Sequence, residues 1–327
     1  MSRWAATRVV VTGGTGFLGR HLVRRLRDEG ADVTAPSSSE CDLLRPEHAR
    51  RLLSARPDHV FHLAARVGGI GANRTHPATF FRDTLTMGMN VLEAAREHSV
   101  GKLIQVGTVC SYPKVTPVPF REEDLWNGFP EETNAPYGIA KRALIVGSMA
   151  YGLEFDLRAA NVLLLNLYGE EDNFDPSSSH VIPALVRKCL EAEEEGRDEI
   201  EIWGDGTATR GFLYVRDAVE GLLAVAEKSE SPEPVNLGVP EEISIRDLAE
   251  AVAGATGFSG RFRFDPAKPN GQPRRALDCR RAEELFGFRA GTSLRDGLAR
   301  TVEWYRVQRE QERLFATDPA AGASARG

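Results

Sequence analysis

Cysteine is scarce in this sequence, and long apolar runs are absent from it. The 327 residues include four widely separated cysteines and no Cys-x-x-Cys pair (Cys41, Cys110, Cys189 and Cys279). This spacing argues against a disulfide scaffold or a cysteine-based zinc module, so we assign no metal ligands, and it fits the reducing cytoplasm. No run approaches the roughly 18 apolar residues of a membrane span, and no charged segment followed by a long apolar stretch opens the chain. We therefore expect neither a membrane association nor a signal peptide.

A strong net charge of one sign is also missing. The 41 Lys and Arg residues nearly balance the 47 Asp and Glu residues, which leaves a net charge of −6 with both signs interspersed. Such a chain does not have the basic character of a general nucleic-acid binder. Its hydrophobic content of 42% is ordinary for a globular protein. At about 150 residues per domain, the length predicts about two domains.

Strand and helix patterns alternate through the first half of the chain. Short apolar runs rich in β-branched residues predict buried parallel strands, and amphipathic segments between them predict helices. The predicted strands are residues 8–12, 31–35, 59–63, 102–107 and 157–164, and the predicted helices are residues 20–29, 46–55, 77–98 and 137–151. This alternation predicts an α/β fold with a Rossmann-type doubly wound parallel sheet.

After about residue 167 the elements become smaller, which predicts a second, smaller mixed α/β lobe. We predict helices at residues 181–195, 216–227, 280–285 and 293–308, a helix capped by Ser244, and strands at residues 200–203, 212–215, 235–239 and 261–265. The sheet domain would span residues 1–167, with 211–234 returning to it, and the second lobe would comprise 168–210 and 235–315. Residues 316–327 are rich in Ala, Gly and Ser, which predicts a disordered tail.

A glycine-rich turn joins the first predicted strand to the first helix. Its candidate site residues are Gly13, Gly14, Thr15, Gly16, Phe17, Leu18 and Gly19. The first two glycines allow a tight turn, the third lets a pyrophosphate approach the backbone, and the fourth lets the helix pack close to the strand. The helix N-terminus then offers free N–H groups and a partial positive charge to the phosphates. A glycine turn without a ligand is the alternative, but a dinucleotide site requires this strand and helix context.

The segment after the second strand bears on the choice between NAD and NADP. An acidic residue there would bind the ribose 2′-OH and repel a 2′-phosphate. The sequence instead has Ser37 and Ser38, followed by a third serine, and its first carboxylate there is Glu40. These hydroxyls can donate to a phosphate, although no arginine stands beside them. We therefore predict NADP(H) as the cofactor and place Asp42 and Leu43 beside the adenine, while a merely solvated serine loop remains the alternative.

A tyrosine and a lysine lie four residues apart, on one face of a predicted helix. A lysine cation favours the phenolate, so Lys141 would lower the high pKa of Tyr137. Such a pair is common by chance, but this one follows the fourth strand of a dinucleotide fold. Thr108 at the end of that strand adds a hydroxyl that could bridge Tyr137 and a substrate oxygen. The three residues predict a proton relay for hydride transfer to or from a carbonyl or an alcohol.

Cys110 and His180 are two further candidates whose residue types alone do not decide their role. Cys110 lies near the carboxyl end of a strand, where ligands bind in open α/β sheets, yet most free cysteines are small buried hydrophobes. His180 lies on a polar loop that leads into a helix. From the residues alone, the two would not be paired.

Several motifs resemble those of the extended short-chain dehydrogenase/reductases and, within them, the GDP-L-fucose synthases. The wider superfamily is indicated by the glycine turn, by His62-Leu63-Ala64-Ala65 and by Tyr137–Lys141. The narrower family is indicated by Val67-Gly68-Gly69-Ile70, Cys110-Ser111-Tyr112-Pro113, Asn166-Leu167-Tyr168-Gly169, Asp172-Asn173-Phe174, His180-Val181-Ile182-Pro183 and Trp203-Gly204. The resemblance covers nearly the whole chain except the tail.

The resemblance implies an NADPH-dependent 3,5-epimerisation and 4-keto reduction of a GDP-4-keto-6-deoxy sugar, giving GDP-L-fucose. It implies that Tyr137 protonates the C4 oxygen, that Lys141 binds the nicotinamide ribose, and that Thr108 helps to hold the oxyanion. It implies that Cys110 and His180 are the base and the acid that invert C3 and C5. It also implies cofactor contacts from Ala64, Ala65, Asn166 and His180, and substrate contacts from Lys188, Trp203, Arg210 and Asn270.

The sequence departs from this family at a few positions near the expected sugar site. Glu170-Glu171 stands where Pro-His is usual, and Asn270 stands where a substrate-binding Asp is usual. These departures leave a different 4-keto nucleotide sugar open as an alternative substrate. A non-catalytic dinucleotide sensor is a further alternative, although a sensor is expected to have a damaged Tyr/Lys pair.

Two more expectations come from the same resemblance. No Asp-Glu pair follows Thr108, which argues against a sugar-nucleotide 4,6-dehydratase. Related enzymes dimerise through the helices that correspond to residues 77–98 and 137–151, so we expect a homodimer.

Overall fold

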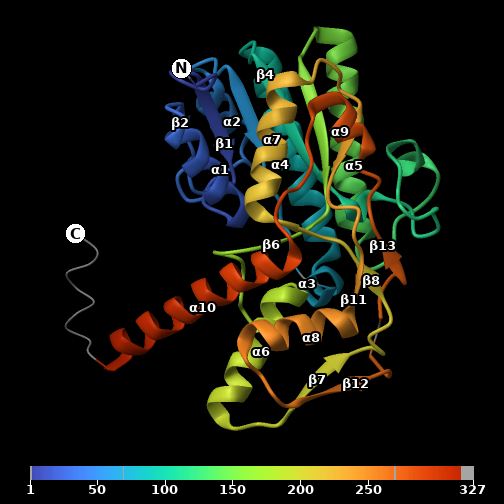
Figure 1. Cartoon of the computed structure of the whole chain (residues 1–327). Coiled ribbons are helices and arrows are strands. Elements are labelled where there is room, and N and C mark those ends of the chain that lie inside the picture. Colours follow the sequence, from blue (N-terminus) through green and yellow to red (C-terminus); the bar gives the residue numbers. More distant parts are fainter. Residues whose placement is uncertain (1, 69, 269, 318–327) are drawn as a thin grey trace.

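The main sheet occupies the upper part of the molecule in Figure 1, which shows a computed structural model. The structure describes residues 2–68, 70–268 and 270–317. Among these residues, a six-stranded sheet has the order β10-β5-β4-β3-β1-β2, and every neighbouring pair is parallel. Its strands are β1 (Arg8–Thr12), β2 (Asp32–Thr34), β3 (His59–His62), β4 (Lys102–Thr108), β5 (Ala159–Leu164) and β10 (Pro234–Leu237).

Helices cover both faces of this sheet. Because side chains alternate along a strand, Val9 and Val11 of β1 pack into one apolar cluster and Val10 packs into another. The first cluster lies under α1 (Phe17–Asp28), α7 (Val215–Lys228) and α9 (Arg280–Phe286). The second lies under α2 (Pro46–Leu53), α4 (Pro77–Glu97) and α5 (Ala135–Phe155). The sheet is therefore doubly wound, as the sequence predicts.

The smaller lobe lies below the sheet in Figure 1, and α10 runs outward from it. Its own apolar cluster joins α6 to α8, as Cys189 and Leu248 illustrate. The helices of this half are α6 (Val181–Glu195), α8 (Ile245–Thr256) and α10 (Leu294–Thr317). The short strands are β6 (Asn166–Tyr168), β7 (Glu199–Trp203), β8 (Thr209–Arg210), β9 (Phe212–Tyr214), β11 (Ile243–Ser244), β12 (Arg261–Asp265) and β13 (Arg274–Arg275). The remaining short elements are α3 (Ile70–Thr75) and the 3-10 turns η1 (Val109–Ser111) and η2 (Glu122–Trp126).

Most predicted elements are present, and three differ in a way that matters. Helix α1 begins at Phe17 rather than at residue 20, because the glycine turn leads directly into helix. The strand predicted at residues 235–239 for the second lobe is instead the edge strand β10 of the main sheet. Helix α10 continues to Thr317, so residues 316 and 317 are helical rather than part of a disordered tail. The rest of that predicted tail, residues 318–327, lies outside the described residues. Within the described part of the chain, no helix is both long enough and apolar enough to span a bilayer.

Candidate active site

The glycine turn after β1 forms a close-packed cradle. Gly13 has φ +72°, and a Cβ atom on it would lie 2.8 Å from the backbone nitrogen of Ala64. A Cβ atom on Gly19 would collide with the carbonyl oxygen of Gly13. Helix α1 begins without a side-chain cap and without an acidic residue in its first turn. Its N-terminal N–H groups and positive dipole end are therefore free for an anion such as a pyrophosphate.

One cavity of about 910 Å³ runs along the carboxyl ends of the strands, and it has the size of a site for a large ligand. The predicted cofactor residues that line it are Gly13, Thr15, Gly16, Phe17, Leu18, Gly19, Ser38, Asp42, Leu43, Ala64, Ala65, Lys141, Asn166 and His180. The predicted catalytic and substrate residues that line it are Thr108, Cys110, Tyr137, Lys188, Trp203, Arg210 and Asn270.

Two predicted cofactor residues do not line this cavity. Gly14 packs toward Ala35, and a Cβ atom on it would lie 2.6 Å from the Ala35 methyl group. Its role is therefore to let the turn pack against the end of β2. The Ser37 hydroxyl donates to Oε2 of Glu40 over 2.7 Å, so it is turned away from the cavity. The assignment of these two residues to the cofactor site remains a prediction.

Tyr137 and Lys141 lie on α5, on the same side of the cavity as the end of β4. Lys141 is buried, and its Nζ donates to the carbonyl oxygen of Val106 over 2.8 Å. Burial lowers the pKa of Lys141 to about 8. Burial, with a smaller contribution from Cys110, raises the pKa of Tyr137 above its usual value. The phenol is therefore protonated at neutral pH, as a proton donor must be.

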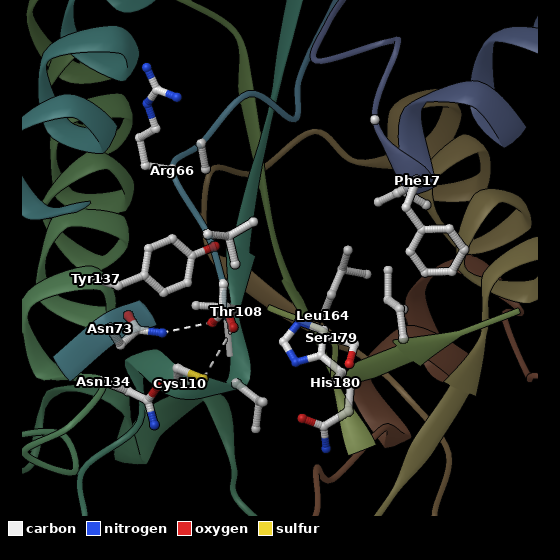
Figure 2. Close-up of a pocket in the computed structure, with 18 of the residues that line it drawn as sticks. Phe17, Arg66, Asn73, Thr108, Cys110, Asn134, Tyr137, Leu164, Ser179 and His180 are labelled. Atoms are coloured by element: carbon white, nitrogen blue, oxygen red, sulfur yellow. Dashed lines mark hydrogen bonds between the residues drawn. The ribbon is translucent and has the colours of Figure 1, made fainter. Parts of the chain in front are cut away.

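Cys110 and His180 face the same space from opposite walls of the cavity, with Thr108 between them (Figure 2). Cys110 lies in the η1 turn that follows β4, and its N–H donates to Oγ1 of Thr108 over 3.2 Å. His180 is the N-cap residue of α6 and is open to the cavity. Desolvation by the surrounding walls lowers the pKa of its imidazole.

The loop before α6 fixes the place of His180. The Asp175 carboxylate accepts the N–H of Ser177 over 2.8 Å and also accepts the Ser178 hydroxyl, which closes a turn just before the helix. These bonds to the Asp175 side chain position the start of α6, and within the described part of the chain the His180 ring itself forms no hydrogen bond. The imidazole nitrogens are therefore available to a ligand.

A row of cations forms the wall at the second lobe. Arg210 of β8 and Arg275 of β13 are neighbours in the strand register, and Lys188 of α6 donates to the carbonyl oxygen of Glu201 over 2.9 Å. Burial and the charge of Arg275 lower the pKa of Arg210 to about 10. Among the described residues, none of the three forms a salt bridge with a carboxylate. Unpaired, partly desolvated cations of this kind suit a diphosphate.

Arg275 is a site residue that the sequence analysis missed. Its Nη1 lies 3.5 Å from Sγ of Cys110, so the guanidinium cation contacts the thiol that is a candidate for the acid–base pair. The pair Arg274-Arg275 follows the Lys268–Gly271 segment and could have been noticed there. Only the β8–β13 pairing, however, shows which of the two arginines faces the cavity.

Asn134 was also missed, and it contributes an amide beside Cys110 (Figure 2). Its Nδ2 donates to Oε2 of Glu131 over 3.0 Å, so the carboxylate fixes its orientation. The only signal in the sequence is its place three residues before Tyr137.

Glu170 and Glu171, the first departure from the family pattern, do not line the cavity. Both oxygens of the buried Glu170 carboxylate accept the Tyr214 hydroxyl, over 2.7 and 2.8 Å, and Arg216 lies 2.9 Å away. Glu171 forms salt bridges with two arginines of α1, Arg20 and Arg24. The Glu170 carboxylate therefore joins the loop after β6 to β9 and α7, and the Glu171 carboxylate joins it to α1.

Asn270, the second departure, lines the cavity beside Trp203. Its Oδ1 accepts the N–H of Asp205 over 2.9 Å. The Trp203 side chain is 60% exposed, with the Lys268 ammonium 5.6 Å from its ring centroid. The indole face is thus accessible to a flat ligand, while the Asn270 carbonyl is already engaged by the protein.

Comparisons with known proteins agree with this geometry. The model of the NAD dependent epimerase/dehydratase family matches residues 9–238. GDP-L-fucose synthase 1 of Arabidopsis thaliana is 38% identical over 302 residues, which cover 92% of this chain and 93% of the relative. The GDP-L-fucose synthase of Sinorhizobium fredii is 40% identical over 297 residues, which cover 90% of this chain and 94% of the relative. The structure of a GDP-L-fucose synthetase from Naegleria fowleri bound to NADP is 30% identical, with a TM-score of 0.87 over 95% of this chain and 96% of that one.

Proposed function

Because the chain belongs to the NAD dependent epimerase/dehydratase family, among relatives that are GDP-L-fucose synthases, we propose that it makes GDP-L-fucose. The substrate would be a GDP-4-keto-6-deoxy sugar, which is epimerised at C3 and C5 and then reduced at C4 with NADPH. The observation that carries this proposal is that Tyr137, Cys110 and His180 all line one cavity with the row of cations. A plain reductase would need only the tyrosine.

The residues at the glycine turn fit a nicotinamide dinucleotide. Side chains at Gly13 and Gly19 would fill the space that a pyrophosphate and the close-packed turn require. Ala64 and Ala65 would contact the dinucleotide from the end of β3, and Lys141 would hold the nicotinamide ribose. When bound, this group supplies the hydride for the reduction. We propose NADP(H) as the cofactor of the reaction, as the NADP-bound neighbour supports.

Tyr137 would deliver the proton to the C4 oxygen in the reduction. Its raised pKa keeps the phenol protonated until the oxygen becomes basic. The buried Lys141 cation, at the other end of the same helical turn, would stabilise the phenolate that remains. The Thr108 hydroxyl would hold the same oxygen while the ring is an enolate.

Cys110 and His180 would invert C3 and C5 from opposite ring faces. One group removes the proton from a carbon beside the 4-keto group, and the other returns a proton to the opposite face. Arg275 would stabilise the thiolate of Cys110, because its guanidinium contacts the sulfur. The lowered pKa of His180 requires a negative partner to bring it into the protonated form, and a bound diphosphate would supply that charge.

Lys188 and Arg210 would bind the diphosphate, and Trp203 would stack on the base. Asn270 presents an amide where the family usually has a carboxylate. This observation favours a different 4-keto nucleotide sugar as the second candidate. Competition among GDP, UDP and dTDP in a thermal-shift assay separates the two candidates, since the first requires the largest shift with GDP.

We also propose that the chain works in the cytoplasm as a homodimer. Its four cysteines are free, as expected in a reducing compartment. Helices α4 and α5 present large apolar side chains to solvent, among them Val146, which is 51% exposed, and Leu153, which is 91% exposed. A second copy would cover this face.

The test is incubation with NADPH and GDP-4-keto-6-deoxymannose. Loss of the absorbance of reduced cofactor, with NMR of the product showing inversion at C3 and C5, is the expected result. The Cys110→Ser variant should lose inversion but keep some direct 4-keto reduction. Cys279→Ser is the matched control, because Cys279 is half-buried outside the cavity. Equal loss of inversion and reduction in Cys110→Ser would contradict the division of roles.

A further inference from the structure

We propose that this chain discriminates only weakly between NADPH and NADH, because the loop after β2 offers no cation to a 2′-phosphate. This inference rests on the proposed dinucleotide binding and concerns the adenosine end of the same cavity. Selective NADP sites place an arginine near the end of the second strand, and selective NAD sites place a carboxylate there. The loop of residues 35–44 follows β2 at this position.

The cavity wall at this loop is formed by uncharged or acidic residues. Pro36, Ser38, Cys41, Asp42 and Leu43 line the cavity here. Among the described residues that form the wall from Pro36 to Ala65, none is a lysine or an arginine, and the next lining residue, Arg66, lies 3.5 Å from the Asp83 carboxylate. A 2′-phosphate would therefore meet the Ser38 hydroxyl and backbone N–H groups, but no guanidinium.

The loop after β2 carries a carboxylate, Glu40, where a cation would bind a 2′-phosphate. Oε2 of Glu40 accepts the backbone N–H of Ser37 over 2.8 Å and the Ser37 hydroxyl over 2.7 Å. These bonds hold the pKa of Glu40 below its usual range. The loop therefore carries a fixed negative charge two residues from Ser38, and this charge opposes a phosphate dianion.

The arginines near this loop are engaged elsewhere. Arg45 lies 3.6 Å from the Asp42 carboxylate, and Arg27 of α1 donates to the carbonyl oxygen of Val33. Arg24 and Arg20, about one and two turns before Arg27 on α1, pair with Glu171. To contact a 2′-phosphate, each would have to give up its present partner.

The test compares the affinities of the two cofactors directly. The full-length protein is titrated with NADPH and with NADH, each followed by its own fluorescence, without any sugar nucleotide. We expect dissociation constants within about tenfold of each other, since one charge-assisted hydrogen bond alone would separate them by roughly 10- to 100-fold. Ser38→Arg should tighten NADPH binding by about tenfold or more and leave NADH binding unchanged.

Two variants on the same loop complete the design. Ser39→Arg is the matched control, because it adds the same charge next to Ser38 at a residue that does not line the cavity, and it should change the ratio far less. Glu40→Gln should tighten NADPH binding severalfold while the loop keeps its Ser37 bonds. A melting temperature for each variant shows that it is folded.

The outcomes separate this inference from the proposed function. A preference of the unmodified protein for NADPH above about tenfold, or a ratio unchanged by both Ser38→Arg and Glu40→Gln, would overturn the inference and leave the proposed reaction intact. Failure to bind either dinucleotide would overturn the proposed function and the inference with it. Comparable binding that shifts toward NADPH in Ser38→Arg supports the inference whatever sugar the enzyme takes.

Discussion

Single side chains in the cavity show how burial sets up the chemistry. Tyr137 and Lys141 are both buried, and in both burial favours the neutral form: it raises the pKa of the phenol and lowers that of the ammonium group to about 8. The sequence spacing predicts that the two share a helix face. It does not predict that Lys141 donates to the Val106 backbone, because that contact depends on how α5 packs on β4.

Replacing the tyrosine tests its role as proton donor. Tyr137→Phe should lower kcat by about 10²- to 10⁴-fold, the usual contribution of a positioned general acid, with NADPH affinity nearly unchanged. Stopped-flow absorbance and cofactor fluorescence measure the two quantities. Tyr151→Phe is the control, because Tyr151 lies on the same helix and bonds Glu93 instead of facing the cavity. Unchanged turnover in Tyr137→Phe would contradict its role as the proton donor.

A second residue, Asp172, links stability to pH. It is 8% exposed, its Oδ2 has no hydrogen-bond partner among the described residues, and burial raises its pKa to about 7. An unfolded aspartate has a pKa of about 3.9, so the folded state binds the proton more tightly. The contribution of this group to stability is therefore present at about pH 4 and is lost as the pH rises to about 7.

Asp172→Asn removes this dependence. The difference in melting temperature, variant minus unmodified protein, should increase between pH 5 and pH 8. The reason is that only the unmodified protein loses stability as the buried Asp172 carboxyl becomes harder to keep protonated. Differential scanning calorimetry at several pH values gives the comparison. The exposed Asp28→Asn should show no such trend, and a difference independent of pH would contradict the assignment.

Some site residues could be predicted one by one, and others could not. The five catalytic candidates stand in motifs, and the structure brings all of them to one cavity. The orientation of Glu170 could not be predicted, because its partners Tyr214 and Arg216 lie more than 40 residues along the chain on β9 and α7. Arg275 was missed for the same reason, since it reaches Cys110 only through the pairing of β13 with β8.

At the scale of elements, the β1–α1 turn shows which glycines are necessary. The local pattern of glycine after a strand and before an apolar helix face predicts this turn well, because all its parts are adjacent in sequence. It does not predict the first residue of α1, because Phe17 and Leu18 carry no start signal of their own. The close approach of α1 to β1 explains why a glycine stands inside the helix.

Two glycine-to-alanine changes separate close packing from helix propensity. Gly19→Ala should destabilise the fold by about 1–3 kcal/mol or more and weaken NADPH binding, because the new methyl group would meet the Gly13 carbonyl. Gly254→Ala in α8 meets no atom within 4 Å and should stabilise by about 0.5–1 kcal/mol. Urea unfolding measures both. Because the two expected changes in unfolding free energy have opposite signs, a general effect of alanine would be easy to recognise.

For the molecule as a whole, the exposed apolar side chains on α4 and α5 predict the surface through which two copies form a dimer. Leu153→Glu places a charge at the centre of the proposed contact and should convert the dimer to a monomer, as measured by light scattering after gel filtration. Leu285→Glu on α9, at a residue 60% exposed away from this face, should leave the mass of the dimer unchanged. A monomer in the unmodified protein, or a dimer that tolerates Leu153→Glu, would contradict the proposal.

The place of β10 at the edge of the main sheet has a consequence for synthesis of the chain. β5 ends at Leu164, and its partner on that side begins only at Pro234, 70 residues later. At about 5–20 residues per second, a ribosome needs roughly 4 to 14 seconds to complete this interval. During that time β5, whose six residues are all buried in the finished fold, is a nascent strand with one unpaired edge, which is the state most open to wrong pairing with another chain. Fragments that stop before residue 234 should therefore be recovered in inclusion bodies. Chaperones should be needed most while residues 165–234 are being translated.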